Sequence, residues 1–408
     1  MCKSGLYFGD VTGTVSIAHR REKTMEKPNV LVVGFNGVGK STLIKTVLGD
    51  EAMKKPKAAS SVKHEDFRVY ENEKVPFRLI DTVGIEPGFL KEQRAVKAVR
   101  KWSGNTLKGG KTEHQISAIW FCVDKYTSKL FPKTIDSFMD AISLWKDVPI
   151  VVVITQSYEE DDVKQTKEIV EKAFLSKKKY ATKLTEVVSV IAKPKQTKEG
   201  EMLPPMGIPE LIELTNSLLP AGLQASEKDM AKYLLSRKRA MSHAVVSVAT
   251  LAGITAGGIA IPAVDLMVLK PTESLEIESI FKIWGIKKTK KAKELLKLIV
   301  DIGTVSLTGK ALVSSLKLIP GINLGAASVN AIISGTIVFA LGEAAAYVFE
   351  QIATGKKTID DMEWVKKVLQ DSLSSTVLDK VTFAAKKLSK NADKTEIMDS
   401  VAQAFAKG

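Results

Sequence analysis

The segment from Gly34 to Ser41 reads GFNGVGKS, and its residue types suit phosphate chemistry. It fits the pattern G-x-x-x-x-G-K-[ST] at every defined position, in which backbone N–H groups of a glycine-rich turn surround phosphate oxygens. In this pattern a lysine reaches the β- and γ-phosphates and a hydroxyl ligates Mg²⁺, roles that fall to Lys40 and Ser41. The residues expected to contact the nucleotide here are Gly34, Asn36, Gly37, Val38, Gly39, Lys40, Ser41 and Thr42.

The elements on either side of this turn are those needed to hold it. Residues 30–33 are Val-Leu-Val-Val, typical of a buried strand, and residues 42–48 suit a helix. A glycine-rich turn that arose by chance would not require a strand before it and a helix after it. The N-terminus of a helix also favours bound phosphate. The sequence therefore predicts a nucleotide-binding protein that uses Mg²⁺ as its cofactor.

A second motif, Asp81-Thr82-Val83-Gly84, follows another apolar run at residues 77–80. A carboxylate at the end of a strand can reach Mg²⁺, and a glycine lets the backbone approach the γ-phosphate. We therefore expect the catalytic set to be Lys40, Ser41, Asp81 and Gly84. Alone, D-x-x-G is a weak pattern, but its place after a strand and downstream of the phosphate loop makes it informative.

The two motifs together resemble the Era-like branch of the small GTPases, in the translation-factor class, over roughly residues 29–220. The resemblance implies an α/β P-loop NTPase fold, with a mostly parallel sheet and helices on both faces, followed here by an all-α domain. It implies GTP and GDP as ligands and allows a homodimer through the GTPase domain. A switch hydroxyl completes the Mg²⁺ shell in this family. Ser61 is the candidate, beside Ser60, unless both serines belong to an ordinary loop.

The base-reading motif of that family, N/T-K-x-D, is altered in this chain. After the apolar run 151–154 the residues are Thr155-Gln156-Ser157-Tyr158, so Tyr158 stands where the family has aspartate. Losing a carboxylate that accepts two guanine N–H groups removes about 1.5–3 kcal/mol of binding. Glu159 or Glu160 is an alternative source of that carboxylate. Thr155, Gln156 and Ala192, in a weak match to the last base-contacting loop, are the expected base contacts, and GTP remains favoured over ATP.

Hydrolysis is also expected to be modified. Ile85 follows the D-x-x-G motif, at the position where switch GTPases of the family carry a water-orienting glutamine. An isoleucine side chain forms no hydrogen bond with water. Family members with a hydrophobic residue here depend on another residue, a partner or a dimer. We therefore expect slow intrinsic GTP hydrolysis.

The chain is expected to have four parts. These are a leader at 1–27, the P-loop GTPase domain at 28–220, a Gly/Ala-rich helical domain at 227–355, and amphipathic helices at 356–408. With 45% hydrophobic and 26% charged residues, the chain is not a largely disordered one. Two cysteines and four scattered histidines exclude a disulfide scaffold and a cysteine-rich zinc site. The leader lacks an apolar signal-peptide core, which predicts a cytoplasmic location.

The helical part contains two uncharged segments, 244–264 and 318–341, each long enough to span a bilayer. A transmembrane hairpin would carry the loop 265–317, with its ten lysines, across the membrane, against the positive-inside rule. A soluble or peripheral helical domain is therefore favoured, with true insertion as the alternative. This part resembles a Gly/Ala-rich helical domain of unknown function that is joined to bacterial Era-like GTPases.

The leading hypothesis is a GTP-binding switch with slow Mg²⁺-dependent hydrolysis, coupled to a helical domain that engages an anionic membrane surface or another partner. The net charge of +14 favours anionic partners. The lysines between 287 and 297 would contact lipid headgroups or RNA phosphates, or else form a solvated helix face. The expected location is cytoplasmic, with peripheral association at the inner face of a membrane as the alternative location. Two alternative functions stay open: a membrane-inserting or pore-like protein gated by its nucleotide domain, and a ribosome-associated assembly GTPase. No RNA-recognition motif supports a nucleic acid or ribosome partner.

Overall fold

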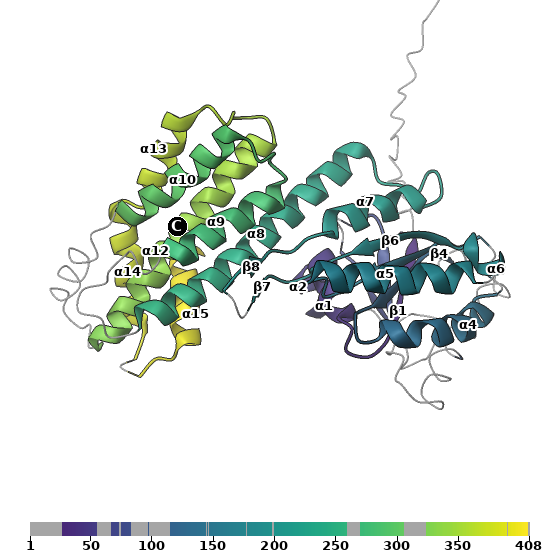
Figure 1. Cartoon of the computed structure of the whole chain (residues 1–408). Helices are drawn as coiled ribbons and strands as arrows, with labels where there is room; N and C mark the ends of the chain where they lie inside the picture. The colour runs from purple at the N-terminus through teal and green to yellow at the C-terminus, as the bar shows by residue number, and fades with distance from the viewer. Residues whose placement is uncertain are drawn as a thin grey trace, which may run out of the picture.

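The chain folds into an α/β domain followed by an all-helical domain (Figure 1). In this computed structural model the described residues are 27–54, 67–72, 75–82, 97, 115–143, 145, 147–176, 178–197, 200–258, 270–305, 324–389 and 391–406. The leader apart from Lys27, and the expected site residues Ser61 and Gly84, lie outside them, as do Ser60 and Ile85.

The α/β domain is built on a six-stranded sheet in the order β2-β3-β1-β4-β5-β6. All neighbouring strands are parallel except β2 and β3, which are antiparallel. The strands are β1 (Asn29–Gly34), β2 (Phe67–Tyr70), β3 (Arg78–Thr82), β4 (Ile116–Val123), β5 (Ile150–Ile154) and β6 (Leu184–Ser189). Strands β1 and β5 are buried along their whole length, which explains their continuous apolar runs.

Helices cover both faces of the sheet, as strand β4 makes clear. Trp120 donates a hydrogen bond from its indole N–H to Thr215 on α7, and the next residue, Phe121, packs edge-on against Phe131 and Phe138 of α4. Since successive strand residues point to opposite faces, α7 and α4 lie on opposite sides. The expected fold class, a mostly parallel sheet between helices followed by a helical domain, is confirmed.

The remaining helices and short strands of this domain connect the strands of the sheet. They are α1 (Lys40–Leu48), α2 (Asp50–Lys54), the short 3₁₀ helix η2 (Ser128–Leu130), α4 (Phe131–Ala141), α5 (Glu160–Leu175), α6 (Lys178–Ala181) and α7 (Ile208–Leu218). Between β6 and α7 lies a small antiparallel hairpin, β7 (Lys195–Gln196) with β8 (Met202–Leu203).

A long helix, α8 (Glu227–Gly257), leads from the α/β domain into the helical domain (Figure 1). Its Ser226 N-cap accepts a hydrogen bond from the Asp229 N–H, which fixes where the helix begins. The other helices are α9 (Lys270–Trp284), α10 (Lys290–Val305), α12 (Ala326–Ala353), α13 (Met362–Ser372), α14 (Ser375–Lys387) and α15 (Lys394–Ala406). Helices α13, α14 and α15 all pack against α12, and α15 also packs against α8. The residues from 356 onward thus share the core of the helical domain.

Helices α8 and α12 pack together along small residues. A Cβ at Gly253 would lie 2.9 Å from Val338, and one at Gly257 would lie 2.4 Å from the hydroxyl of Ser334. The G-x-x-x-G step at these glycines therefore serves a close helix crossing inside the domain. Both helices are long and apolar enough to cross a membrane by length and composition, but 83% of the apolar window of α12 is buried inside the fold, against 50% for α8.

Candidate nucleotide site

The glycines of the phosphate loop adopt backbone conformations that other residues avoid. Gly37 and Gly39 have φ values of 82° and 98°, in the left-handed region. Gly34 has φ 147°, and a Cβ there would lie only 2.3 Å from the carbonyl oxygen of Cys122 on the neighbouring strand. The loop leaves β1 at Gly34 and enters α1 at Lys40, so residues 34–42 lie at the carboxyl end of the central strand, where ligands bind in such sheets.

The Lys40 side chain lies across this loop. Its ammonium donates hydrogen bonds to the carbonyl oxygens of Gly34, at 3.1 Å, and Phe35, at 2.9 Å. Burial lowers the pKa of Lys40, and the nearby Cys122 and Asp81 act in the opposite direction. Two of the three ammonium protons are held by the loop itself. To contact two phosphates, the ammonium must exchange at least one carbonyl for a phosphate oxygen.

Asp81 lies near the end of β3, next to the central strand that carries the loop. Its Oδ1 is buried and has no hydrogen-bond partner among the described residues. Burial raises its pKa to about 6, while the positive charges of Lys40 and Arg68 lower it. A buried carboxylate oxygen with no protein partner suits a hard cation such as Mg²⁺. The residues present fit this ion, with Asp81 and the exposed Ser41 hydroxyl as the residues that would hold it.

Thr155 joins the base-reading loop to the phosphate loop. Its hydroxyl oxygen lies 2.5 Å from the carbonyl oxygen of Val38 and 3.0 Å from that of Val123, and its side chain is buried. The next residue, Gln156, has φ 55°, a left-handed conformation that is unusual outside glycine and turns the chain sharply after β5. Thr155 therefore positions the two loops, and Gln156 lies at the surface beside them.

The loop that contains Ala192 is held against α1, the helix that follows the phosphate loop. The hydroxyl of Thr46 on α1 donates a hydrogen bond to the Ala192 carbonyl oxygen at 2.9 Å. On its other side, the Ser157 N–H donates to the Val190 carbonyl oxygen at 3.2 Å. The structure thus brings together the phosphate loop, Asp81, Thr155, Gln156 and Ala192 around one end of the sheet.

Lys195 belongs to this corner, although the sequence did not single it out. Its ammonium lies 3.8 Å from the centroid of the Tyr158 ring, a cation–π contact. Burial raises the pKa of the Tyr158 hydroxyl. No spacing rule links residue 158 to residue 195, because the contact depends on how the β7–β8 hairpin folds back.

Comparison with known proteins agrees with this geometry. Residues 29–156 match the family described as 50S ribosome-binding GTPase. They contain the phosphate loop, Asp81, and Thr155, which contacts the loop at Val38. This part of the chain is a GTPase domain. The GTPase domain therefore belongs to the class that binds and hydrolyses GTP, generally with Mg²⁺. No curated protein matches the chain.

Several solved structures resemble the chain at low identity. Era in complex with MgGDPNP and part of 16S ribosomal RNA is 18% identical over 53% of this chain and 68% of that one, with a TM-score of 0.32. The cytosolic domain of the T. maritima FeoB iron transporter is 12% identical over 85% and 99%, with a TM-score of 0.29. A bacterial dynamin pair is 10% identical over 93% and 89%, with a TM-score of 0.28. These scores lie below 0.5, so the assignment rests on the family match and the site.

Proposed function

We propose that the chain is a GTPase switch, in which helix α1 connects the nucleotide to the helical domain. GTP binds with Mg²⁺ in the loop that begins at Gly34, is hydrolysed slowly, and changes the position of α1. The observation that carries the proposal is that α1, nine residues long, begins at the phosphate loop and ends in hydrogen bonds with α8.

The chemistry proposed is attack of water on the γ-phosphate, in line with the leaving oxygen. Lys40 would neutralise charge on the β- and γ-phosphate oxygens, and the N–H groups of the loop would orient them. Ser41 and Asp81 would hold Mg²⁺, which when bound supplies further neutralisation of phosphate charge. Gly84 and Ser61 keep their proposed roles at the γ-phosphate and the metal, on segments outside the described residues.

The C-terminus of α1 is satisfied in part by α8. Because the last four carbonyls of a helix have no partner within it, they need donors from elsewhere. In α1 all four have one: Lys45 from the Gly49 N–H, Thr46 from Arg237 at 3.3 Å, Val47 from the Tyr233 hydroxyl, and Leu48 from Asn72 at 2.7 Å. Two of the donors are side chains of α8, so a shift of α1 is felt directly by the helix that enters the helical domain.

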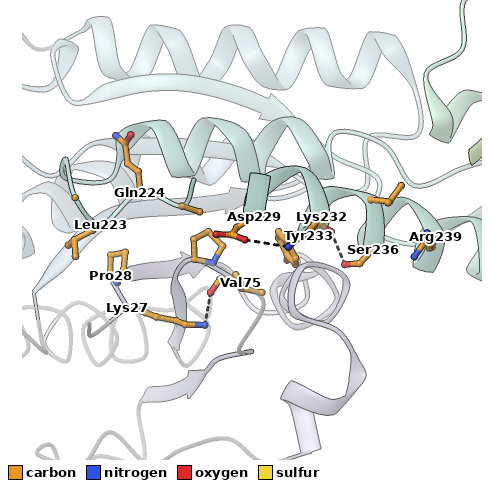
Figure 2. Close-up of a pocket in the computed structure, with 14 residues that line it drawn as sticks. Lys27, Pro28, Val75, Leu223, Gln224, Asp229, Lys232, Tyr233, Ser236 and Arg239 are labelled. Carbon is orange, nitrogen blue, oxygen red and sulfur yellow. Dashed lines mark hydrogen bonds and ion pairs between the residues drawn. The ribbon is translucent and has the colours of Figure 1, made fainter. Parts of the chain in front are cut away.

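A pocket lies beside this contact. Figure 2 shows Tyr233 on one wall and Pro28 and Val75, from the GTPase domain, on another. The cavity has a volume of about 640 Å³ and also reaches Leu223 in the linker before α8. Met230 and Tyr233 of the first turns of α8 are nevertheless buried in the core.

Removing the two α8 donors is expected to uncouple the domains. In a Tyr233→Phe, Arg237→Ala double variant, each lost bond costs about 1 kcal/mol. GTP affinity should stay within about threefold, because neither residue reaches the phosphate loop. The GTP-dependent change in hydrogen exchange of α8 and α12 should fall by at least about half. Lys238→Ala, on the same helix, is the matched control. An unchanged exchange response in the double variant would contradict this route.

Intrinsic hydrolysis is expected to be slow. Isoleucine at position 85 provides no group that orients water, so the isolated monomer should turn over below about 1 s⁻¹. Phosphate release measured over a range of protein concentrations checks this, and a rate that rises with concentration would favour activation through a GTPase-domain dimer. A concentration-independent rate above about 1 s⁻¹ would show that the chain carries its own water-positioning group.

A membrane role is the second candidate, and the apolar helices favour it. The apolar window of α8 is only half buried, and Leu251 within it is 39% exposed. Peripheral contact through α8 needs no unfolding, whereas insertion of α12 would first break the core of the helical domain. Flotation with anionic liposomes, with and without nucleotide and after carbonate washing, separates the two.

The family description makes ribosomes the other partner to test, by salt-dependent co-sedimentation.

A further inference from the structure

The corner that should receive the purine base is built from two neighbouring strand ends. Strands β5 and β6 pair in parallel, with Ile154 opposite Ser189, so the loops that follow them leave the same edge of the sheet. The Ser157–Val190 hydrogen bond joins these loops, and the Thr155–Val38 bond joins them to the phosphate loop. A nucleotide whose phosphates lie on the loop at Gly34 therefore has its base beside residues 155–158 and 190–195.

At this corner a cation, Lys195, lies beside the position where the family has an anion. Tyr158 occupies the aspartate position, and Lys195 reaches over its ring from the β7–β8 hairpin. The ring contact engages the ammonium through its charge and leaves N–H groups able to donate to a ligand. Lys195 is exposed at the surface, while Tyr158 is half-buried. The corner therefore offers a donor, and the tyrosine holds that donor in place.

A donor and a carboxylate read different atoms of a purine. A carboxylate accepts hydrogen bonds from the N1–H and 2-amino groups of guanine. A lysine ammonium accepts no hydrogen bond from either group. Lysine instead donates to O6 and N7 of guanine, whereas adenine has an amino group at C6. A lysine reader therefore separates 6-oxopurines from adenine without sensing the 2-amino group.

We infer that Lys195, positioned by the ring of Tyr158, is the base-specificity residue of this site and selects 6-oxopurine nucleotides by donating to O6. The inference rests on the proposed GTP binding and adds to it a stated substrate class, in which GTP and ITP are equivalent. The chain would then select GTP without the carboxylate of the family, because Lys195 recognises O6 of the base.

The test is a competition titration of the full chain in Mg²⁺, with a fluorescent GTP analogue displaced by GTP, ITP or ATP. We expect GTP and ITP to bind within about threefold of each other, and ATP about tenfold or more weakly. Lys195→Met, which keeps the length of the side chain but removes its donor, should lose most of the discrimination against ATP. Tyr158→Asp should create a preference for GTP over ITP of about tenfold, because it restores an acceptor for the 2-amino group. Lys164→Met, an exposed lysine on α5, is the control.

Three results would overturn the inference. A wild-type preference of tenfold or more for GTP over ITP would mean that a carboxylate, with Glu159 the nearest in sequence, reads the base. Equal binding of ATP and GTP by the wild-type chain would mean that O6 is not read. Equal weakening of all three nucleotides by Lys195→Met would make Lys195 a structural residue only. Failure of the proposed function looks different, because no nucleotide would then displace the analogue, or Lys40→Ala would leave binding unchanged.

Discussion

Replacing Lys40 with alanine is expected to weaken GTP binding by about 1.5–3 kcal/mol, roughly ten- to a hundredfold in Kd. Lys40 is buried within the loop, and its ammonium would reach the phosphates by moving away from the Gly34 and Phe35 carbonyl oxygens. Hydrolysis at saturating GTP should fall further, because charge on the phosphate oxygens grows toward the transition state and no other lysine of the loop can meet it.

The matched control is Lys45→Ala on the same helix. Lys45 is a half-exposed lysine that pairs with exposed Asp50 at 2.9 Å, away from the loop, so its removal should change Kd by less than about twofold. Titration with a fluorescent GTP analogue measures both variants, and circular dichroism confirms that each is folded. A Lys40→Ala protein that binds GTP within twofold of wild type would refute the assignment of the phosphate site.

Replacing Glu276 with glutamine is expected to stabilise the helical domain at neutral and alkaline pH. Glu276 on α9 is fully buried, and neither carboxyl oxygen has a hydrogen-bond partner among the described residues. The carboxyl packs directly onto Gly342 of α12, where a Cβ would lie 2.1 Å from Oε1. Glu273, one turn earlier, is 1% exposed, and its Oε2 also lacks a partner within the described structure.

These two carboxyls make the stability of the domain depend on pH. Burial raises the pKa of Glu276 well above its ordinary value, and the negative charges of Glu273 and Glu343 raise it further. Burial raises the pKa of Glu273 from 4.5 to about 7, and Lys270 opposes this. Glu343 also pairs with His243 at 2.6 Å, and Lys270 also pairs with Asp301 at 3.4 Å.

The direction follows from proton binding. A carboxyl whose pKa is raised in the folded state binds protons more tightly there, so its contribution to stability is complete below about pH 4.5 and is lost as the pH rises through the folded pKa. For Glu273 the rise from 4.5 to about 7 corresponds to roughly 3 kcal/mol above both values. The free energy of unfolding should therefore fall between about pH 5 and about pH 8, with Glu276 extending the decline.

Chemical denaturation of the full chain, followed by far-UV circular dichroism across this range, measures the effect. Glu276→Gln should raise the free energy of unfolding by about 1–3 kcal/mol at the alkaline end and flatten its dependence on pH. Glu278→Gln, an exposed glutamate on the same helix, should change little. Stability that increases with pH in the wild type, or a destabilised Glu276→Gln protein at alkaline pH, would contradict the prediction.

Local sequence patterns predict the phosphate loop, and the class of fold that they predict is confirmed. Both depend on local chemistry, because a β-branched strand, a glycine-rich turn, Lys40 and a helix lie within twenty residues of one another. Asp81 could be found in the same way, since it ends the next predicted buried strand. The weak match at Ala192 and the replacement of aspartate by Tyr158 indicated where the base would bind. They did not indicate which side chain would recognise the base.

The features that join distant parts of the chain depend on how its helices and strands pack together. This packing placed Lys195 over Tyr158, anchored α1 to Tyr233 and Arg237 of α8, and buried Glu276 against Gly342. It also made α12, an apolar helix of membrane-spanning length, the centre of a packed domain. The physical reason is the same in each case. A side chain's partner, and the amount of water it loses, depend on which elements pack beside it, and periodicity along the chain records only that an apolar face must be covered.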